Sequence, residues 1–312
     1  MHRQAFKYVY GPVPSRRLGR SLGVDLVPHK TCTYDCIYCQ LGKTTKKTIM
    51  RREYVPLNQL LAEINQKLKT GCSPDYITLA GSGEPTLYAK IGELIDKLKK
   101  RTKKPVAVIT NGSLLWDPAV QDALLQADLV IPSLDAGDAD TFGYVNRPHG
   151  KIHFDKMVDG LIGFRKKYHK KLWLEVFLLS GITAIDAEVI KIAAISKEIA
   201  PDKIQLNTVA RPPAEVFAVP VNELQMTKFA KRFGKNTEII INFRRHTRLS
   251  GFTASSADVL NLISRRPCSL YDIANGLSIA HNEAVKILGH LEGKNLIETH
   301  LKGNSTFYVS AK

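Results

Sequence analysis

The feature that most constrains the fold is a regular alternation of short apolar runs and amphipathic segments between residues 21 and 211. The short runs are rich in Val, Ile and Leu and are bounded by Gly or Pro, which is typical of parallel strands buried on both faces. The predicted strands are residues 22–27, 76–80, 106–110, 129–134, 172–179 and 203–209. Six successive β–α units predict an α/β fold with a parallel sheet, either open or curved into a partial (β/α)6 barrel, and we expect the partial barrel.

Helices are predicted between these strands, because apolar residues recur there at helical spacing. One stripe runs from Leu57 to Leu68 and a second from Leu87 to Leu98, and residues 154–168 and 186–200 repeat the pattern. In such sheets the chemistry gathers at the carboxyl ends of the strands. We therefore look for functional residues directly after each predicted strand.

The pattern changes after residue 213. Residues 214–251 are irregular and read as a connecting extension, and residues 252–312 predict a small α+β domain that resembles a winged helix. Its predicted helices are residues 256–266, 269–277 and 280–294, with Ser269 as a helix cap and Asp272 three residues on. Its strands, residues 296–299 and 306–310, are joined through Lys302, Gly303 and Asn304. The chain is thus divided into a core at 1–213 with a basic N-terminal arm, the extension, and this tail.

Three of the five cysteines lie within eight residues, at Cys32, Cys36 and Cys39. This crowding after a predicted strand favours a metal centre over a disulfide framework. Three thiolates on one short loop can bind three irons of a cubane cluster and leave the fourth iron open to a small chelating molecule. The alternative is a zinc site completed by a histidine such as His29.

The run from Cys32 to Cys39, with the aromatic Tyr38 before its last cysteine, resembles the signature of the radical S-adenosylmethionine (SAM) superfamily. The resemblance implies an enzyme in which the open iron of a [4Fe–4S] cluster binds SAM. An electron from the cluster then cleaves the cofactor, and the resulting 5′-deoxyadenosyl radical abstracts hydrogen from a substrate. It also implies a reductant such as flavodoxin or ferredoxin.

A glycine turn with a carboxylate follows the second strand, at Gly81-Ser82-Gly83-Glu84. Glycines let the backbone approach a ligand closely, and a carboxylate accepts charge-assisted hydrogen bonds from an ammonium group. The turn is similar to the Gly-Gly-Glu segment of the superfamily, with Ser82 in place of one glycine, and this implies a contact with SAM. An ordinary βα turn is the alternative.

Polar residues also lie on or after the later strands. Asn111 follows the third strand, and Ser133 and Asp135 follow the fourth. Asp135 is either a cofactor contact or a cap of the next element. Glu175 lies within the apolar fifth strand, where a buried carboxylate needs a partner, either the cofactor or a structural one. Gln205 and Asn207 share one face of the sixth strand, and Asn207 is a further cofactor candidate.

The net charge of +16 is concentrated at the start of the chain, where residues 1–52 carry 11 Lys and Arg against 2 Asp and Glu. Such a field favours an anionic partner, with a merely solubilising surface as the alternative. The candidates for substrate contact are Arg16, Arg17, Arg20, Arg147, His149 and Arg211. The glycine- and arginine-rich segment 11–23 and the cysteine run resemble a group related to the wyosine synthases of tRNA modification. This implies tRNA or a protein as substrate.

Other features narrow the class of protein. No run of 18 apolar residues appears and the N-terminus lacks the apolar stretch of a signal peptide, so we expect a cytoplasmic protein without membrane contact. The nearly neutral tail favours protein contact or substrate presentation over DNA binding. Besides an enzyme acting on RNA or protein, two alternatives stay open: the same chemistry on a small anionic metabolite, and a cluster-bearing transcription regulator without turnover.

Overall fold

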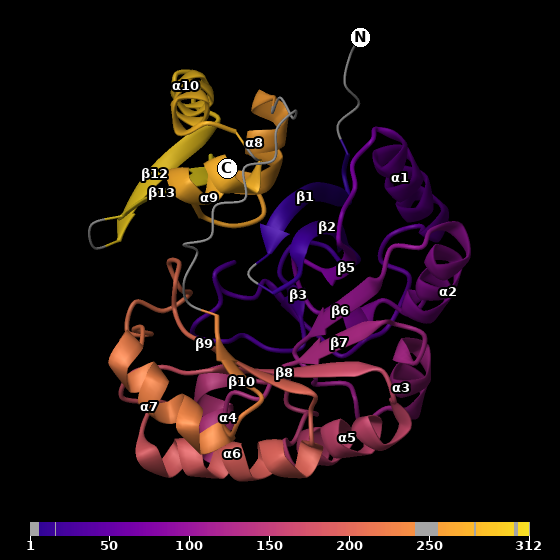
Figure 1. Ribbon diagram of the computed structural model, residues 1–312, viewed down its shortest axis with the longest axis vertical. Helices are drawn as coiled ribbons and strands as arrows, with labels where there is room; N and C mark the ends of the chain where they lie inside the picture. Colours follow the sequence, from indigo (N-terminus) through magenta and orange to yellow (C-terminus); the bar gives the residue numbers. More distant parts are fainter. Residues whose placement is uncertain (1–5, 16, 241–254, 278, 303–304, 312) are drawn as a thin grey trace.

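The computed structural model describes residues 6–15, 17–240, 255–277, 279–302 and 305–311. Its main element is an eight-stranded sheet with the order β1-β2-β5-β6-β7-β8-β9-β10 (Figure 1). The strands are β1 (Val9–Ser15), β2 (Gly19–Asp25), β5 (Tyr76–Ala80), β6 (Val106–Thr110), β7 (Leu129–Pro132), β8 (Lys171–Phe177), β9 (Lys203–Asn207) and β10 (Thr237–Ile239). All neighbours pair in parallel except β1 and β2. The predicted partial barrel is thus confirmed.

Helices cover the outer, convex side of this sheet (Figure 1). They are α1 (Leu57–Lys69), α2 (Ile91–Arg101), α3 (Pro118–Leu124), α5 (Phe154–Lys167), α6 (Asp186–Ile199) and α7 (Glu223–Phe233), while α4 (Ala139–Asn146) follows β7. Their apolar stripes, such as Leu60 and Ile64 on α1, are buried against the strands. Burial of these stripes is the main force that holds the layers together.

The structure adds elements that the periodicity did not predict. Strand β1 contains Pro12 and Pro14, and proline is tolerated there because β1 is an edge strand. Helix α7 and strand β10 lie in the predicted extension 214–251, whose last residues, from 241, are outside the described part of the chain. Helices α3 and α4 are too short to show a clear stripe.

In its described residues, the tail contains three helices and a separate sheet, which pack around an apolar core distinct from that of the large sheet. It contains α8 (Ser256–Ile263), α9 (Leu270–Gly276) and α10 (His281–Glu292), and a sheet of order β11-β13-β12. Its strands are β11 (Cys268–Ser269), β12 (Ile297–Lys302) and β13 (Ser305–Ser310). Ser269 caps α9, and Asp272 completes a capping box, as predicted. The domain boundaries stay predictions, and Gly303 and Asn304 lie outside the described residues, as does the boundary at 251–252.

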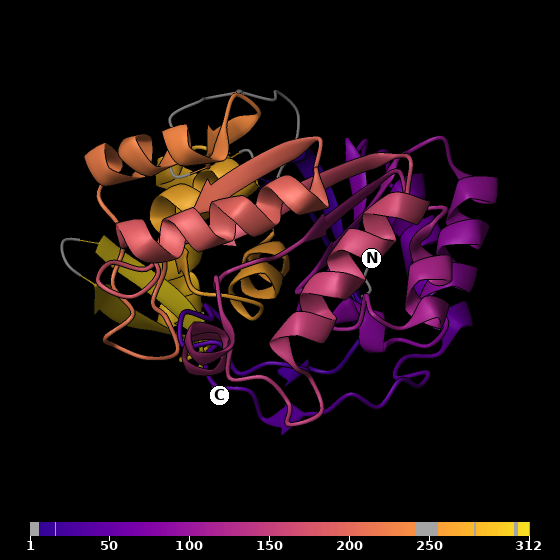
Figure 2. The ribbon, with the colours of Figure 1, turned by 90° about the horizontal axis from the view of Figure 1, so that it is seen from below.

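The tail packs on the edge of the sheet at β1, on the side opposite to α5 and α6 (Figure 1, Figure 2). Val13 of β1 belongs to the tail's apolar core. Arg265, which follows α8, donates to Asp25 at the end of β2 over 2.8 Å and stacks on the ring of Tyr10. Burial raises the pKa of Asp25, and Arg265 opposes this effect. In the described ranges, no helix is long and apolar enough to cross a bilayer.

We expect Arg265→Gln to lower the free energy of unfolding by about 3 kcal/mol, because it leaves the Asp25 carboxylate buried without its cation. Urea denaturation at pH 7 measures the change. Arg232→Gln is the control, since Arg232 lies on α7 with its side chain half exposed, and we expect a change below about 0.5 kcal/mol. Equal effects of the two substitutions would contradict the importance of the Arg265–Asp25 pair.

Candidate functional site

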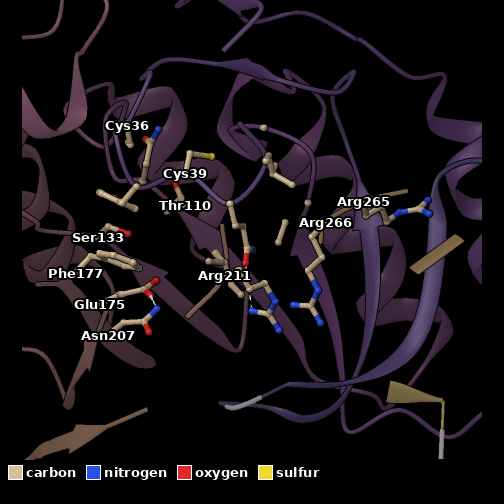
Figure 3. Close-up of a pocket in the computed structure, with 18 of the residues that line it drawn as sticks. Cys36, Cys39, Thr110, Ser133, Glu175, Phe177, Asn207, Arg211, Arg265 and Arg266 are labelled. Atoms are coloured by element: carbon tan, nitrogen blue, oxygen red, sulfur yellow. Dashed lines mark hydrogen bonds between the residues drawn. The ribbon is translucent and has the colours of Figure 1, made fainter. Parts of the chain in front are cut away.

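The carboxyl ends of the parallel strands surround a cavity of about 390 Å³ (Figure 3). The three clustered cysteines line it, together with polar residues from the ends of β5 to β9 and with residues of the tail. The predicted site residues that line it are Arg17, Cys32, Cys36, Tyr38, Cys39, Gly81, Gly83, Glu84, Asn111, Ser133, Asp135, Glu175, Asn207 and Arg211. Residues from seven separate segments are therefore brought to one place, as the strand-end rule predicts.

The loop that carries the cysteines is held against the turn after β5 by two backbone hydrogen bonds. The amide of Lys30 donates to the carbonyl of Ser82 over 2.6 Å, and the amide of Glu84 donates to the carbonyl of Thr31 over 3.1 Å. A Cβ atom at Gly83 would lie 1.9 Å from the carbonyl oxygen of Thr31. Glycine is therefore required at position 83 because the cysteine loop packs there.

Gly81 and Ser82 are fixed by Asp25 rather than by contacts inside the cavity. Gly81 has a positive φ of 120°, and a Cβ atom there would lie 1.8 Å from a carboxylate oxygen of Asp25. Both the amide and the hydroxyl of Ser82 donate to that same oxygen, over 2.9 and 3.1 Å. The two glycines thus permit close approach of protein groups, the Asp25 carboxylate and the Thr31 carbonyl, while their approach to a ligand stays a prediction.

Each of the three cysteine sulfurs accepts a hydrogen bond from a different polar side chain. The side-chain amide of Asn111 is 3.6 Å from Cys32 Sγ, that of Asn146 is 3.5 Å from Cys36 Sγ, and Lys30 Nζ is 3.2 Å from Cys39 Sγ. Such donors stabilise negative charge on sulfur and tune the properties of a bound metal centre.

Burial opposes ionisation of the Cys32 and Cys36 thiols by raising their pKa values. It raises the pKa of Cys32 to about 12, with a further contribution from the Glu84 carboxylate. Burial and the other two cysteines raise the pKa of Cys36 well above its usual value. A cationic metal centre reverses this preference, because a coordinating thiol is deprotonated outright.

The geometry does not favour the zinc alternative. His29 is exposed and does not line the cavity. Within the described segments, no three His, Cys, Asp or Glu side chains converge as ligands of a single ion would. A cubane cluster needs no such convergence, because each cysteine binds a different iron.

Glu84 is buried at the centre of the strand ends. One of its oxygens accepts from the amide and hydroxyl of Thr86 and from the hydroxyl of Thr110, over 2.6–2.9 Å, and the other accepts from the amide of Asn111. Burial raises its pKa, and these donors oppose the rise. Glu84 therefore links β5 to β6 while it faces the cavity.

Asp135 and Tyr38 form a second buried polar group. The Tyr38 hydroxyl donates to Asp135, as does Asn146 Nδ2 over 2.9 Å, and the amide of Phe177 donates to the other oxygen over 3.0 Å. Burial raises the pKa of Asp135 to about 6, although Tyr38 and Asn146 lower it. The Tyr38 ring stacks on Phe177 at 4.0 Å between centroids. Asp135 thus positions the cysteine loop on β7 and β8 and does not cap the next element; Asp138 caps α4.

Glu175 has the partners that its burial requires, as predicted. It forms an ion pair with Arg17 and accepts from Asn207 Nδ2 over 2.8 Å. Arg17, Glu175 and Asn207 come from three segments and meet on the cavity wall, with Ser133 beside Glu175 in the adjoining strand end. Gln205 differs, because its side chain donates to Glu238 of β10.

Three predicted substrate contacts do not line the cavity. Arg147 pairs with Glu215 over 2.7 Å, and the amide of His149 donates to the carbonyl of Thr33. Arg20 lies at the opposite end of β2 from the cysteine loop, where its amide donates to Asp75. Arg16 is outside the described residues.

Sequence reasoning missed several residues of the site. Lys30 and Asn146 contact cysteine sulfurs, and Arg265 and Arg266 of the tail line the cavity. The Arg-Arg pair before Pro267 at the end of a predicted helix was a visible signal, but only the fold brings it to the core.

Comparison with known proteins identifies the family. A family model described as the radical SAM superfamily matches residues 26–193. The chain is 36% identical over 308 residues to a UPF0026 protein of Helicobacter pylori, with 97% of each chain covered. It is 42% identical over 296 residues to a protein of Brachyspira hyodysenteriae named GTPase Obg, covering 94% of this chain but only 43% of that longer protein. A solved radical SAM methyltransferase from Sphaerobacter thermophilus shares the fold with a TM-score of 0.51 at 15% identity, over 70% of this chain and 65% of that one.

The chain therefore belongs to the radical SAM superfamily, and within it to the UPF0026 proteins. This confirms the resemblance drawn from the cysteine run. The protein is an enzyme, and its cofactors are a [4Fe–4S] cluster and SAM.

We expect Gly83→Ala to reduce the iron bound after anaerobic reconstitution several-fold, because the added methyl group pushes the cysteine loop away from the turn after β5. Iron analysis and visible absorbance measure the loss. Gly143→Ala is the matched control, since a Cβ at Gly143 on α4 meets no atom within 4 Å. Full iron binding by Gly83→Ala would show that the loop does not depend on this contact.

We expect Lys30→Met to lower the midpoint potential of the cluster by on the order of 50 mV, because reduction adds a negative charge that the ammonium stabilises. A redox titration followed by electron paramagnetic resonance measures the shift. Lys197→Met, on the exposed side of α6, is the control and should leave the potential unchanged. An unchanged potential in Lys30→Met would refute a role of Lys30 in tuning.

Proposed function

We propose that this enzyme abstracts a hydrogen atom from an organic substrate held in the cavity beside the cysteine loop. The observation that carries the proposal is the position of Cys32, Cys36 and Cys39 at one end of a cavity whose walls are polar strand ends. Three cysteines leave one iron of a cubane without a protein ligand. When bound there, the cluster and SAM supply one-electron cleavage of the cofactor to a 5′-deoxyadenosyl radical, which accepts the hydrogen atom.

The chain's own residues then have separate tasks. The three cysteines hold the cluster, with Lys30, Asn111 and Asn146 as donors to their sulfurs. The residues proposed to orient SAM are Tyr38, Gly81, Ser82, Gly83, Glu84, Asn111, Ser133, Asp135, Glu175 and Asn207. Most of them also hydrogen-bond to one another, which fixes their positions before the cofactor binds. Fixed polar groups of this kind orient a ligand at low entropic cost.

Apolar residues complete the walls. Ile109, Phe177 and Leu262 line the cavity, and Leu262 comes from the tail. A closed cavity excludes water and rival hydrogen donors from a reactive radical. The tail is therefore part of the reaction chamber in this proposal, and protein contact or substrate presentation remains a prediction for its outer surface.

The electron that cleaves SAM has to be supplied by a separate electron carrier. Lys43, Lys46 and Lys47 are exposed on the segment that follows the cysteines. This basic surface supports the proposal that an acidic carrier such as flavodoxin or ferredoxin docks there, with the enzyme in the cytoplasm.

We expect the anaerobically reconstituted protein, given dithionite and SAM, to form 5′-deoxyadenosine, because the open iron of its cluster binds the cofactor. Chromatography of the quenched reaction measures the product. Cys36→Ala should reduce it to background, because it removes one ligand of the cluster. Cys72→Ala is the control, since Cys72 does not line the cavity, and it should match the wild type. A full cluster that never cleaves SAM, even with cell extract as a source of substrate, would refute the proposal and favour a regulator.

A further inference from the structure

The arginines that line the cavity come from distant parts of the chain. Arg17 follows β1, Arg211 follows β9, and Arg265 and Arg266 follow α8 of the tail. Figure 3 shows the guanidinium groups of Arg211 and Arg266 side by side, away from Cys36 and Cys39, while Arg265 points in another direction. Two guanidinium groups, those of Arg211 and Arg266, thus line the cavity close enough to affect each other electrostatically.

Most of these arginines already have a carboxylate partner. Arg17 pairs with Glu175, Arg265 with Asp25 over 2.8 Å, and Arg211 with Asp272 over 2.9 Å. For Arg266, by contrast, no carboxylate belonging to the described residues lies within 4.0 Å. Among the described residues, Asp272 is the carboxylate that interacts with both Arg211 and Arg266, and these two guanidinium groups carry one more positive charge than that carboxylate balances.

The surroundings of Arg211 make this excess costly. Its side chain is 3% exposed, and burial followed by the charge of Arg266 lowers its pKa. The ammonium of Lys302 adds a further cation, 3.1 Å from the carbonyl oxygen of Arg211. A buried site with excess positive charge gains most from an anion, because the screening by water is weak there.

Arg211 also connects this region to the cluster loop. Its Nη1 donates to the side chain of Gln40, the residue after Cys39, while its Nη2 donates to Asp272 of the tail. A ligand that contacts Arg211 therefore lies between the cysteine loop and the tail. A substrate bound there lies next to the loop that holds the cluster in the proposed function.

We propose that Arg211 and Arg266 bind the oxyanion, a carboxylate or a phosphate, of a small substrate. Guanidinium groups match both oxyanions in planar, bidentate geometry. The cavity of about 390 Å³ must hold SAM as well, so the space left beside SAM admits a small molecule but not a folded RNA or protein as a whole. This inference rests on the proposed function, because only that function makes the bound anion a substrate.

The experiment measures anion binding directly, by thermal shift and calorimetry on the cluster-loaded protein. The probes are succinate for carboxylates and glycerol phosphate for phosphates, each titrated with SAM present. We expect one of the two anions to raise the melting temperature of the wild type. The same anion should bind Arg266→Gln at least about 10-fold more weakly than it binds the wild type. Arg266→Lys should recover part of the affinity, and Arg232→Gln on α7 should match the wild type. The class that binds identifies the oxyanion.

Three results would overturn the proposal. In the first, neither anion binds the wild type, or the anions bind Arg266→Gln as tightly as they bind the wild type. In the second, Arg266→Gln weakens SAM itself, which would assign the arginines to the cofactor. In the third, bulk tRNA binds in an Arg266-dependent manner while the small anions do not. Because anion binding needs no cofactor cleavage, a protein that binds the anion but forms no 5′-deoxyadenosine would refute the proposed function and leave this anion site standing.

Discussion

The structure depends on the contact between the cysteine loop and the turn after β5. Two backbone hydrogen bonds join Lys30 to Ser82 and Glu84 to Thr31, and they form only because Gly83 has no side chain to separate the two segments. Glu84 extends the same connection to β6 through Thr110 and Asn111. The loop that carries the three cysteines is therefore fixed to two neighbouring strands of the sheet by backbone hydrogen bonds and by a buried carboxylate.

Burial then determines the state of the thiols. The same packing that fixes Cys32 and Cys36 raises their pKa values, so these cysteines ionise readily only when a cationic centre is present. The donors Asn111, Asn146 and Lys30 compensate part of the cost of a thiolate at each sulfur. Folding and metal binding are coupled in this way: the folded protein positions the thiols, and the bound metal favours their ionised form.

Local pattern predicted the sheet and drew attention to the three clustered cysteines that line the cavity, but it did not predict the whole site. β5 and β6 have the predicted bounds because short buried runs between turn residues leave few alternatives. The partner of Glu175 was required by its burial, yet Arg17 lies 158 residues away, and no spacing rule connects them. Arg20 was predicted from the glycine- and arginine-rich segment 11–23, and Arg147 and His149 from the short basic run that contains them, but in the fold these residues contact other partners. A contact between distant segments depends on tertiary packing, which local periodicity does not encode.

The tail illustrates the same limit for charge. Counted over its length the tail is nearly neutral, with 6 Lys and Arg against 5 Asp and Glu from residue 252 onward. This count argued against DNA binding by the tail, but it averages over faces that the fold separates. Arg265 and Arg266 lie at the end of α8, directed at the core, whereas Glu292 and Glu298 are exposed. What matters for an anion is the charge that faces the cavity, and there Arg211 and Arg266 share one carboxylate. The tail thus contributes basic side chains to the wall of the cavity, which a DNA-binding role for it would not require.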